Sequence, residues 1–276
     1  MVKNMKYKDL DNYLIAVDLD GTLITGFDDY DKKSFEILKD VAKRNYCVIA
    51  TGRPFRSSKF YYDLLDLHTP IINYNGAWVH HPTDKNFETK MINIDKNILI
   101  DFIDKERDIL NNVFCEIEDN IFLLKETEEI KPYLHLDGGV LHVGEFKDIL
   151  YGNPNGAIIF AKPGSEERLE NYIKNVINDQ FKIRYWFVNT SLVCEFYNPK
   201  TSKANALKKI CDYYHIDHDK TICIGDGHND IEMIDFAKIG VAMNNGHPEL
   251  LEHADIITDD VTHNGVYNFF MMDIKK

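Results

Sequence analysis

Short, continuous apolar runs alternate with amphipathic helical patterns at both ends of this 276-residue chain. The predicted strands are residues 13–18, 46–50, 70–76, 221–225, 239–243 and 254–258. Strands that are apolar on both faces need helices on both faces, and such strands form parallel sheets. The pattern therefore predicts an α/β fold, with a Rossmann-like, doubly wound parallel sheet as its core.

The segments between these strands have helical periodicity. Phe35, Leu38 and Val41 form one apolar stripe within residues 31–44. Further helices are predicted from Pro54 to about Leu65, over 201–214 with Thr201 or Ser202 as the N-cap, over 229–237, and after Pro248.

The middle of the chain has a different pattern, with strands that lie close together in the sequence. Residues 112–125 and 182–198 read as hairpins, 156–164 as a strand, and a helix follows Ser165. The glycines and Pro154 of residues 126–155 indicate loops, and the segment is also compatible with a short helix. We expect an inserted α+β cap domain at 84–190, and a catalytic core formed by 1–83 and 191–276.

Charge and cysteine content narrow the possible partners. The net charge of −13 disfavours nucleic acid, which needs a basic surface. No apolar run reaches the roughly 20 residues that span a bilayer, and the N-terminus lacks the apolar region of a signal peptide. Five cysteines without a CxxC pair favour free thiols in a reducing compartment. We expect a cytoplasmic monomer or homodimer that binds neither nucleic acid nor membranes.

Two aspartates, Asp18 and Asp20, end the first buried strand. Alternate residues of a strand point to the same side, so the two carboxylates start out close together. They repel each other unless a cation lies nearby. Ligands of parallel α/β sheets bind at the carboxyl ends of the strands, which is where Asp18 stands. On its own, the sequence DLDG is also compatible with a plain turn.

Two other segments could bind an anion. Thr51 and Gly52 follow a strand and precede a helix, where a hydroxyl and backbone amides can form an anion pocket, and Arg53 could add charge. Lys203 lies in the first turn of a helix, at the positive end of the helix dipole. Each segment alone has a simpler explanation, a helix cap or a surface lysine. A phosphorylated substrate of this acidic chain would need such local positive charge or a metal.

The segment GDGHND, residues 225–230, follows another apolar strand and contains Asp226 and Asp230. Carboxylate oxygens with few nitrogen or sulfur neighbours suit Mg²⁺, and His228 next to Asn229 is expected to be exposed. An EF-hand is excluded because its glycine and distal glutamate are missing. The eleven histidines form no set with zinc spacing.

Together these segments resemble the four motifs of the haloacid dehalogenase (HAD) superfamily of phosphatases. The motifs stand in order as DLDGT (18–22), Thr51 in ATGR, Lys203 and GDGHND. The cap position, NYNGA (73–77) and the segment 240–258 resemble the Cof-type subfamily. The chain departs from that subfamily at Ala204, where glycine is common, and at residues 244–246, where Gly-Asn-Ala is common.

The resemblance implies a role for each motif residue. Asp18 would be the nucleophile that forms an aspartyl-phosphate, and Asp20 the general acid and base. Mg²⁺ would be held by Asp18, Asp226 and Asp20, the last through the Leu19–Asp20 peptide region, and Asp230 would either bind the ion directly or support its ligands. The phosphate would be bound by Thr51, Gly52, Lys203, Asn229 and the backbone of Leu19, whose side chain would turn into the core.

The predicted function is Mg²⁺-dependent hydrolysis of a small phosphorylated metabolite, such as a sugar phosphate. A phosphomutase of the same superfamily is an alternative that the motifs do not separate. A non-catalytic protein that binds a phosphometabolite is a further alternative, disfavoured because Asp18, Asp20 and Lys203 are all present.

Overall fold

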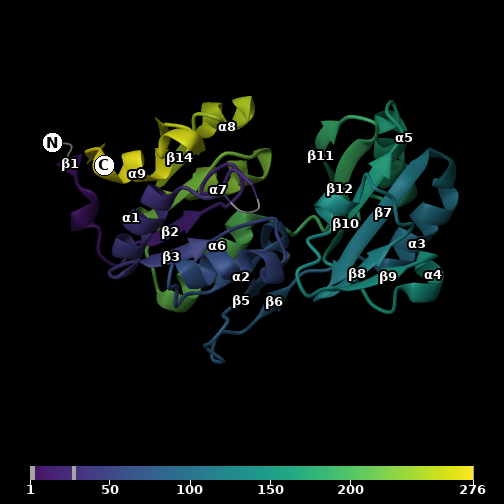
Figure 1. Ribbon diagram of the computed structural model, residues 1–276, viewed down its shortest axis with the longest axis horizontal. Helices are drawn as coiled ribbons and strands as arrows, with labels where there is room; N and C mark the ends of the chain where they lie inside the picture. The colour runs from purple at the N-terminus through teal and green to yellow at the C-terminus, as the bar shows by residue number, and fades with distance from the viewer. Residues whose placement is uncertain (1–3, 27–28, 276) are drawn as a thin grey trace. The chain divides into compact units, whose positions relative to one another are not determined.

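The computed structural model describes residues 4–26 and 29–275, which divide into two compact units. The first unit comprises Met1–Arg53, Ser58–Lys90 and Ser202–Lys276, and the second comprises Pro54–Ser57 and Met91–Thr201. In Figure 1 the first unit contains both ends of the colour scale, while teal and green strands form most of the second. The second unit is thus an insertion in the first.

A parallel five-stranded sheet forms the centre of the first unit (Figure 1). Its order is β15 (Ile256–Thr258), β14 (Ile239–Met243), β13 (Thr221–Gly225), β2 (Leu14–Val17) and β3 (Tyr46–Ile49). An isolated parallel bridge between Ala50 and Ile72 places β4 (Ile71–Asn73) next to β3. β4 then pairs antiparallel with β5 (Trp78–His80), which is followed in the same sheet by β6 (Lys90–Met91). The predicted α/β fold with a parallel sheet is confirmed.

Helices cover the sheet as its apolar strands require. One cluster joins α6 (Lys203–Tyr214), α7 (Ile231–Phe236) and α8 (Pro248–His253) to the sheet, through side chains such as Leu207, Met233 and Leu250 packed with Ala16 and Cys223. α1 (Lys32–Ala42) contacts β3 and α9 (Gly265–Met271), and α2 (Phe55–Leu64) follows β3. α9 was not predicted from the sequence.

The register of β2 sets the position of the chemistry. All four residues of β2 are buried, and Val17 pairs with Ile224 of β13 on one side and Ile49 of β3 on the other. The chain segments that follow these three strands therefore leave the sheet side by side. They begin with Asp18, Ala50 and Asp226.

The second unit contains a six-stranded sheet with helices packed on one face. The sheet order is β11 (Lys182–Val188), β12 (Leu192–Tyr197), β10 (Gly156–Ala161), β7 (Leu110–Ile117), β8 (Asn120–Leu123) and β9 (Val140–Val143). The pairs are antiparallel except β8 with β9. Phe102 of α3 (Lys96–Lys105) is fully buried between Tyr172, which follows α5 (Glu166–Asn171), and Phe196 of β12. This unit also contains the short helix α4 (Phe146–Ile149).

The boundaries of the inserted unit differ from the expected 84–190. β12 lies beyond residue 190, yet its backbone pairs with both β10 and β11 and so belongs to this sheet. Residues 84–90 fall with the first unit, where β6 extends the sheet of β4 and β5. The boundaries of the inserted unit thus follow from backbone pairing between strands, which the sequence pattern alone does not show.

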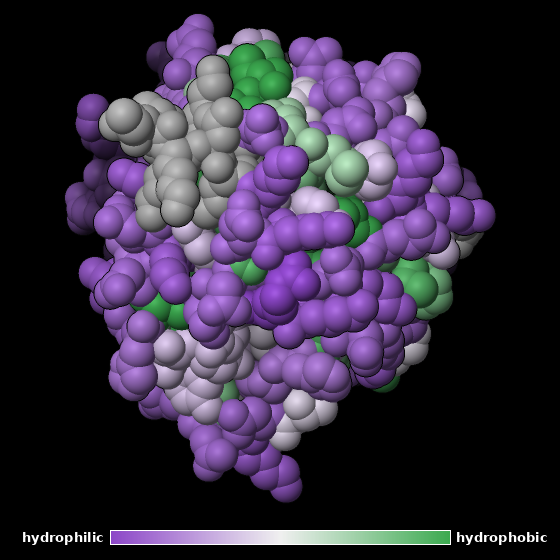
Figure 2. All heavy atoms as spheres, turned by 90° about the vertical axis from the view of Figure 1, so that its left-hand side faces the viewer, coloured by the Kyte–Doolittle hydropathy of each residue, from purple (hydrophilic) through white to green (hydrophobic). Residues whose placement is uncertain are grey.

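The surface in Figure 2 is mainly hydrophilic, with apolar residues scattered over it. None of the helices in residues 4–26 and 29–275 combines the length and the apolar character needed to pass through a membrane. The five cysteines, Cys47, Cys115, Cys194, Cys211 and Cys223, are free and buried.

Phe102→Ala should destabilise the second unit by about 3–5 kcal/mol, because it leaves a large cavity among buried aromatic rings. The chain has two tryptophans, Trp78 in the first unit and Trp186 in the second. Urea unfolding followed by Trp186 fluorescence in a Trp78→Phe background measures this loss. Val176→Ala, at a position that is 46% exposed, is the control and should cost less than about 1 kcal/mol. Equal effects of the two substitutions would contradict the packing described.

Candidate active site

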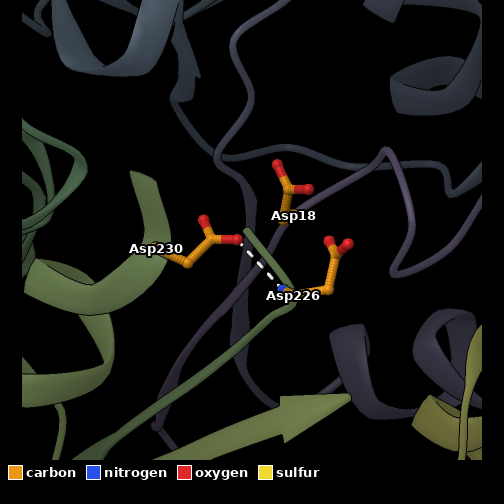
Figure 3. Close-up of side chains that lie close together, drawn as sticks. All are labelled: Asp18, Asp226 and Asp230. Atoms are coloured by element: carbon orange, nitrogen blue, oxygen red, sulfur yellow. Dashed lines mark hydrogen bonds between the residues drawn. The ribbon is translucent and has the colours of Figure 1, made fainter. Parts of the chain in front are cut away.

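Three carboxylates meet beyond the carboxyl ends of β2 and β13 (Figure 3). Asp18 directly follows β2, Asp226 directly follows β13, and Asp230 ends the short turn after Asp226. Each offers one oxygen atom, and these oxygens lie within 4.8 Å of one another. Asp18 and Asp230 are 5% and 0% exposed, so this is a buried cluster of negative charge.

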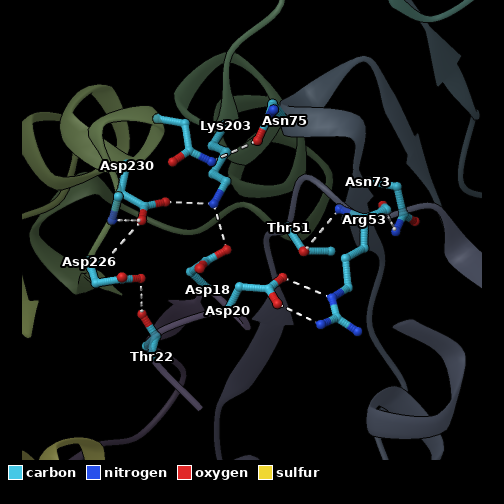
Figure 4. Close-up of polar contacts among 12 residues, drawn as sticks. Asp18, Asp20, Thr22, Thr51, Arg53, Asn73, Asn75, Lys203, Asp226 and Asp230 are labelled. Atoms are coloured by element: carbon cyan, nitrogen blue, oxygen red, sulfur yellow. Dashed lines mark hydrogen bonds and ion pairs between the residues drawn. The ribbon is translucent and has the colours of Figure 1, made fainter. Parts of the chain in front are cut away.

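Lys203 is the cation of this cluster. Its Nζ lies 2.7 Å from Asp18 Oδ1 and 2.6 Å from Asp230 Oδ1, and the residue is 1% exposed (Figure 4). Burial alone would lower the pKa of Lys203, but Asp18 and Asp230 raise it above its ordinary value, so the ammonium stays charged. The two carboxylates compensate for its place in the first turn of α6, where the helix dipole disfavours a cation.

Asp230 also shapes the turn that carries Asp226. Its second oxygen, Oδ2, accepts hydrogen bonds from the backbone amides of Asp226 (3.0 Å) and Gly227 (2.9 Å). Both Asp230 oxygens therefore have protein donors. Asp230 links Lys203 to the Asp226 backbone, which suits an orienting role behind a metal.

Asp226 is held by residues of two other loops. Thr22 donates its hydroxyl to Asp226 Oδ1 (3.0 Å), and Asn245 Nδ2 lies 3.4 Å from Oδ2 and donates to the Gly21 carbonyl at 2.9 Å. Gly21 has φ +74°, and a Cβ added there would lie 2.1 Å from Asp226 Oδ2. Only glycine permits both this backbone conformation and this close approach.

The charge balance of the cluster favours a divalent cation. Burial raises the pKa of Asp18 well above its ordinary value, and Asp230, Asp226 and Asp20 raise it further, while Lys203 lowers it. Burial and then Asp230 raise the pKa of Asp226 to about 7. Three carboxylates with one lysine leave excess negative charge in a poorly solvated place. A donor set of carboxylate oxygens fits Mg²⁺, so the residues present suit that ion.

Asp20 lies apart from this cluster. Arg53 donates two hydrogen bonds to the Asp20 carboxylate, from Nε at 2.8 Å and from Nη2 at 2.5 Å (Figure 4). Arg53 is 6% exposed, whereas the Asp20 side chain is 54% exposed. The carboxylate of Asp20 is thus oriented by the segment after β3 and open to a reactant. Of its two expected roles, this orientation suits proton transfer, and a part in metal binding would fall to its backbone.

The remaining motif residues surround the same place. Thr51 is fully buried, and its Oγ1 accepts from the Arg53 amide at 3.1 Å. The Leu19 side chain is buried, and its carbonyl accepts from the amides of Leu23 and Ile24, which closes the turn after β2. Asn229 donates to Asn75 Oδ1 at 2.8 Å.

Sequence reasoning assigned no role to Thr22, Asn75 and Asn245, which the structure adds to the site. Thr22 and Asn75 lie within the quoted segments DLDGT and NYNGA, and Asn245 lies where the chain departs from the Cof-type pattern. Their position in those segments was the only signal in the sequence. Their partners come from distant parts of the chain, which the sequence does not show.

Comparison with known proteins identifies the class. The family described as haloacid dehalogenase-like hydrolase matches residues 15–270, so the chain belongs to this family. The uracil-derivative phosphatase YitU of Bacillus subtilis is 32% identical over 261 residues, covering 93% of this chain and 96% of YitU. YitU is named for 5-amino-6-(5-phospho-D-ribitylamino)uracil.

Solved structures show the same fold. A haloacid dehalogenase-like hydrolase from Bacteroides thetaiotaomicron has a TM-score of 0.79 at 20% identity, covering 94% of this chain and 98% of that one. A sugar phosphatase of HAD subclass IIB has a TM-score of 0.76 at 21% identity, covering 94% and 97%. The resemblance seen in the four motifs is confirmed. The protein is a phosphatase, a hydrolase that acts on a phosphorylated compound.

Asp226→Asn should make the protein without metal more stable at pH 8. The pKa of Asp226 is about 7 in the folded chain and near 3.8 when unfolded, so the folded state binds more protons between these values. The contribution of the Asp226 carboxyl group to the free energy of unfolding therefore falls as pH rises from about 4 to 7. In EDTA, the melting temperature should fall less between pH 5.5 and pH 8 for Asp226→Asn than for the wild type.

Added Mg²⁺ should reverse this order at pH 8, because it stabilises the wild type and needs the Asp226 carboxylate. Glu232→Gln serves as the control, since it removes one negative charge from α7, the helix that follows the Asp226–Asp230 turn, outside the carboxylate cluster. The same response to Mg²⁺ in Asp226→Asn and wild type would show that Asp226 does not bind the ion.

Proposed function

We propose that this phosphatase hydrolyses a small phosphomonoester with the help of Mg²⁺, through a covalent phosphate on Asp18. The proposal rests on one observation: a buried lysine joins two carboxylates at the carboxyl ends of parallel strands, and a third carboxylate lies beside them. Nucleophile, cation and metal ligands are thus available within one small region.

The first half-reaction uses Asp18 and Asp20. Lys203 holds Asp18 Oδ1, which leaves Oδ2 to attack phosphorus. The new Oδ2–P bond forms as the ester P–O bond breaks, and Asp20 gives a proton to the departing oxygen. Arg53 keeps the Asp20 carboxylate in a fixed orientation, and each of its oxygens retains a second lone pair for that proton.

The second half-reaction regenerates the site. Asp20, now ionised, takes a proton from water while that water attacks the phosphorus of the aspartyl-phosphate. The bond between phosphorus and Asp18 breaks, inorganic phosphate leaves, and Asp18 returns as a carboxylate. One residue thus serves as acid and then as base.

Three groups would stabilise the transferring phosphoryl group: the Thr51 hydroxyl, the Gly52 amide and the Lys203 ammonium. Asp18 and Asp226 would hold Mg²⁺, with Asp230 orienting them. When bound, Mg²⁺ supplies positive charge that offsets the carboxylates and the phosphate oxygens.

The similarity to YitU guides the choice of substrate. With 32% identity over almost the whole of both chains, the compound for which YitU is named is the first candidate, ahead of sugar phosphates in general. Both are phosphorylated metabolites with a polyol or sugar chain. The five buried free thiols suit a reducing compartment, and we place the activity in the cytoplasm.

Asp18→Asn and Asp20→Asn should fail in different ways with p-nitrophenyl phosphate and Mg²⁺. Loss of the nucleophile should lower kcat by roughly 10⁴-fold or more. Loss of the general acid and base should lower it by about 10²–10⁴-fold and slow the second step most, because nitrophenolate leaves without a proton. Acid quench after mixing should therefore find phosphoenzyme in Asp20→Asn and none in Asp18→Asn. Identical behaviour of the two variants would refute these roles.

The substrate class is tested by measuring kcat/KM for 5-amino-6-(5-phospho-D-ribitylamino)uracil and for a panel of hexose and pentose phosphates. We expect the uracil compound to be hydrolysed with the highest kcat/KM. A preference for a sugar phosphate would support the broader alternative. Conversion of a hexose phosphate to its isomer, without release of phosphate, would indicate a phosphomutase and overturn the proposal.

A further inference from the structure

The loop between β4 and β5, residues 74–77, has an unusual backbone. Tyr74, Asn75 and Gly76 have φ values of 49°, 55° and 100°, three consecutive residues in the left-handed region. Residues with side chains avoid this region, although asparagine tolerates it better than most. Such conformations persist where the surroundings impose them, and they gather at functional sites.

The backbone of this loop is fastened to the segment that follows β3. Asn75 N donates to the Thr51 carbonyl at 3.0 Å, and Tyr74 N donates to the Arg53 carbonyl at 3.3 Å. The fully buried Asn73 adds a side-chain bond to the same Arg53 carbonyl at 2.9 Å. Three hydrogen bonds therefore connect residues 73–75 to the segment Thr51–Arg53.

The loop also contacts the segments that carry Lys203 and Asp226. A Cβ added to Gly76 would lie 2.2 Å from the carbonyl oxygen of Ser202, the N-cap residue just before Lys203. The side chain of Asn75, 4% exposed and labelled in Figure 4, accepts a hydrogen bond from Asn229, a residue in the turn after Asp226. One loop thus contacts three motif segments.

Asn75 packs directly on Gly52. A Cβ added to Gly52 would lie 3.1 Å from Asn75 Oδ1 and 3.4 Å from Nδ2. The carboxamide therefore lies between Gly52 and Asn229, two residues of the segments that follow β3 and β13. Backbone pairing fixes the strands, but it does not fix the distance between loops beyond the strand ends.

We propose that Asn75 is a positioning residue, which holds Asn229 and Gly52 in the arrangement that binds the phosphoryl group. This inference rests on the proposed function of the site. Asn75 acts through these two residues, and its left-handed backbone places its carboxamide between them. Small errors in such placement lower the rate of phosphoryl transfer, because catalysis there is mainly positioning.

Asn75→Gly separates this role from a purely structural one. Glycine adopts the same backbone without strain, so the loop should keep its shape while the carboxamide is lost. We expect unchanged thermal unfolding, a fall in kcat for p-nitrophenyl phosphate of roughly 10- to 100-fold, and weaker binding of inorganic phosphate in a thermal-shift titration with Mg²⁺. A crystal structure of the variant should show the Asn229 side chain displaced.

Asn12→Gly is the matched control, since Asn12 is also left-handed, with φ 57°, and lies before β2, at the opposite end of that strand from Asp18. It should leave both kcat and phosphate binding unchanged. Asn229→Ala should also lower kcat and phosphate binding, and because Asn75 acts partly through Asn229, the double variant should lose less than the product of the two single losses. Multiplying losses would show that the two residues act independently and would overturn the inference.

Two other outcomes have separate meanings. An active wild type with unchanged kcat and phosphate binding in Asn75→Gly contradicts the role of Asn75 and leaves the proposed function intact. An inactive wild type contradicts the proposed function. In that case, the phosphate titration and the position of Asn229 still decide whether Asn75 organises the anion site.

Discussion

The buried ammonium of Lys203 is the interaction on which the site depends. Removing a lysine from water is costly, and so is removing a carboxylate, but two carboxylates around one ammonium offset much of that cost. Asp18 and Asp230 lie in segments that follow different strands, β2 and β13, and Lys203 lies at the start of a helix. Their ion pairs join three segments that the sheet only brings near one another.

The parallel sheet makes this junction possible. β2 lies between β13 and β3, so the segments after these strands leave the same edge together. Asp18 and Asp226 follow two of them, and Thr51 follows the third. The roles of the carboxylates follow from these positions. Asp18 and Asp230 are buried and paired with Lys203, while Asp20 is paired with Arg53 and remains accessible.

The sequence predicted the parts of this account that depend on periodicity. Continuous apolar strands predict the sheet, and the carboxyl ends of parallel strands predict where Asp18, Thr51 and Asp226 gather. It did not predict the pairing of Asp20 with Arg53 or the contact of Asn75 with Asn229, because such contacts depend on loop dihedrals and side-chain directions. β9 was not predicted, because this edge strand is largely exposed and pairs in parallel with its neighbour. Its sequence therefore lacks a clear alternation of apolar and polar residues.

The most direct test is a double-mutant cycle between Lys203→Met and Asp230→Asn in a Trp186→Phe background, which reports the free energy of unfolding in EDTA from Trp78 fluorescence. Lys203→Met leaves buried carboxylates without their cation and should cost about 3–5 kcal/mol. Adding Asp230→Asn removes one of those charges and should recover a large part of the loss. Losses that simply add would contradict the claim that this buried ion pair holds the site together.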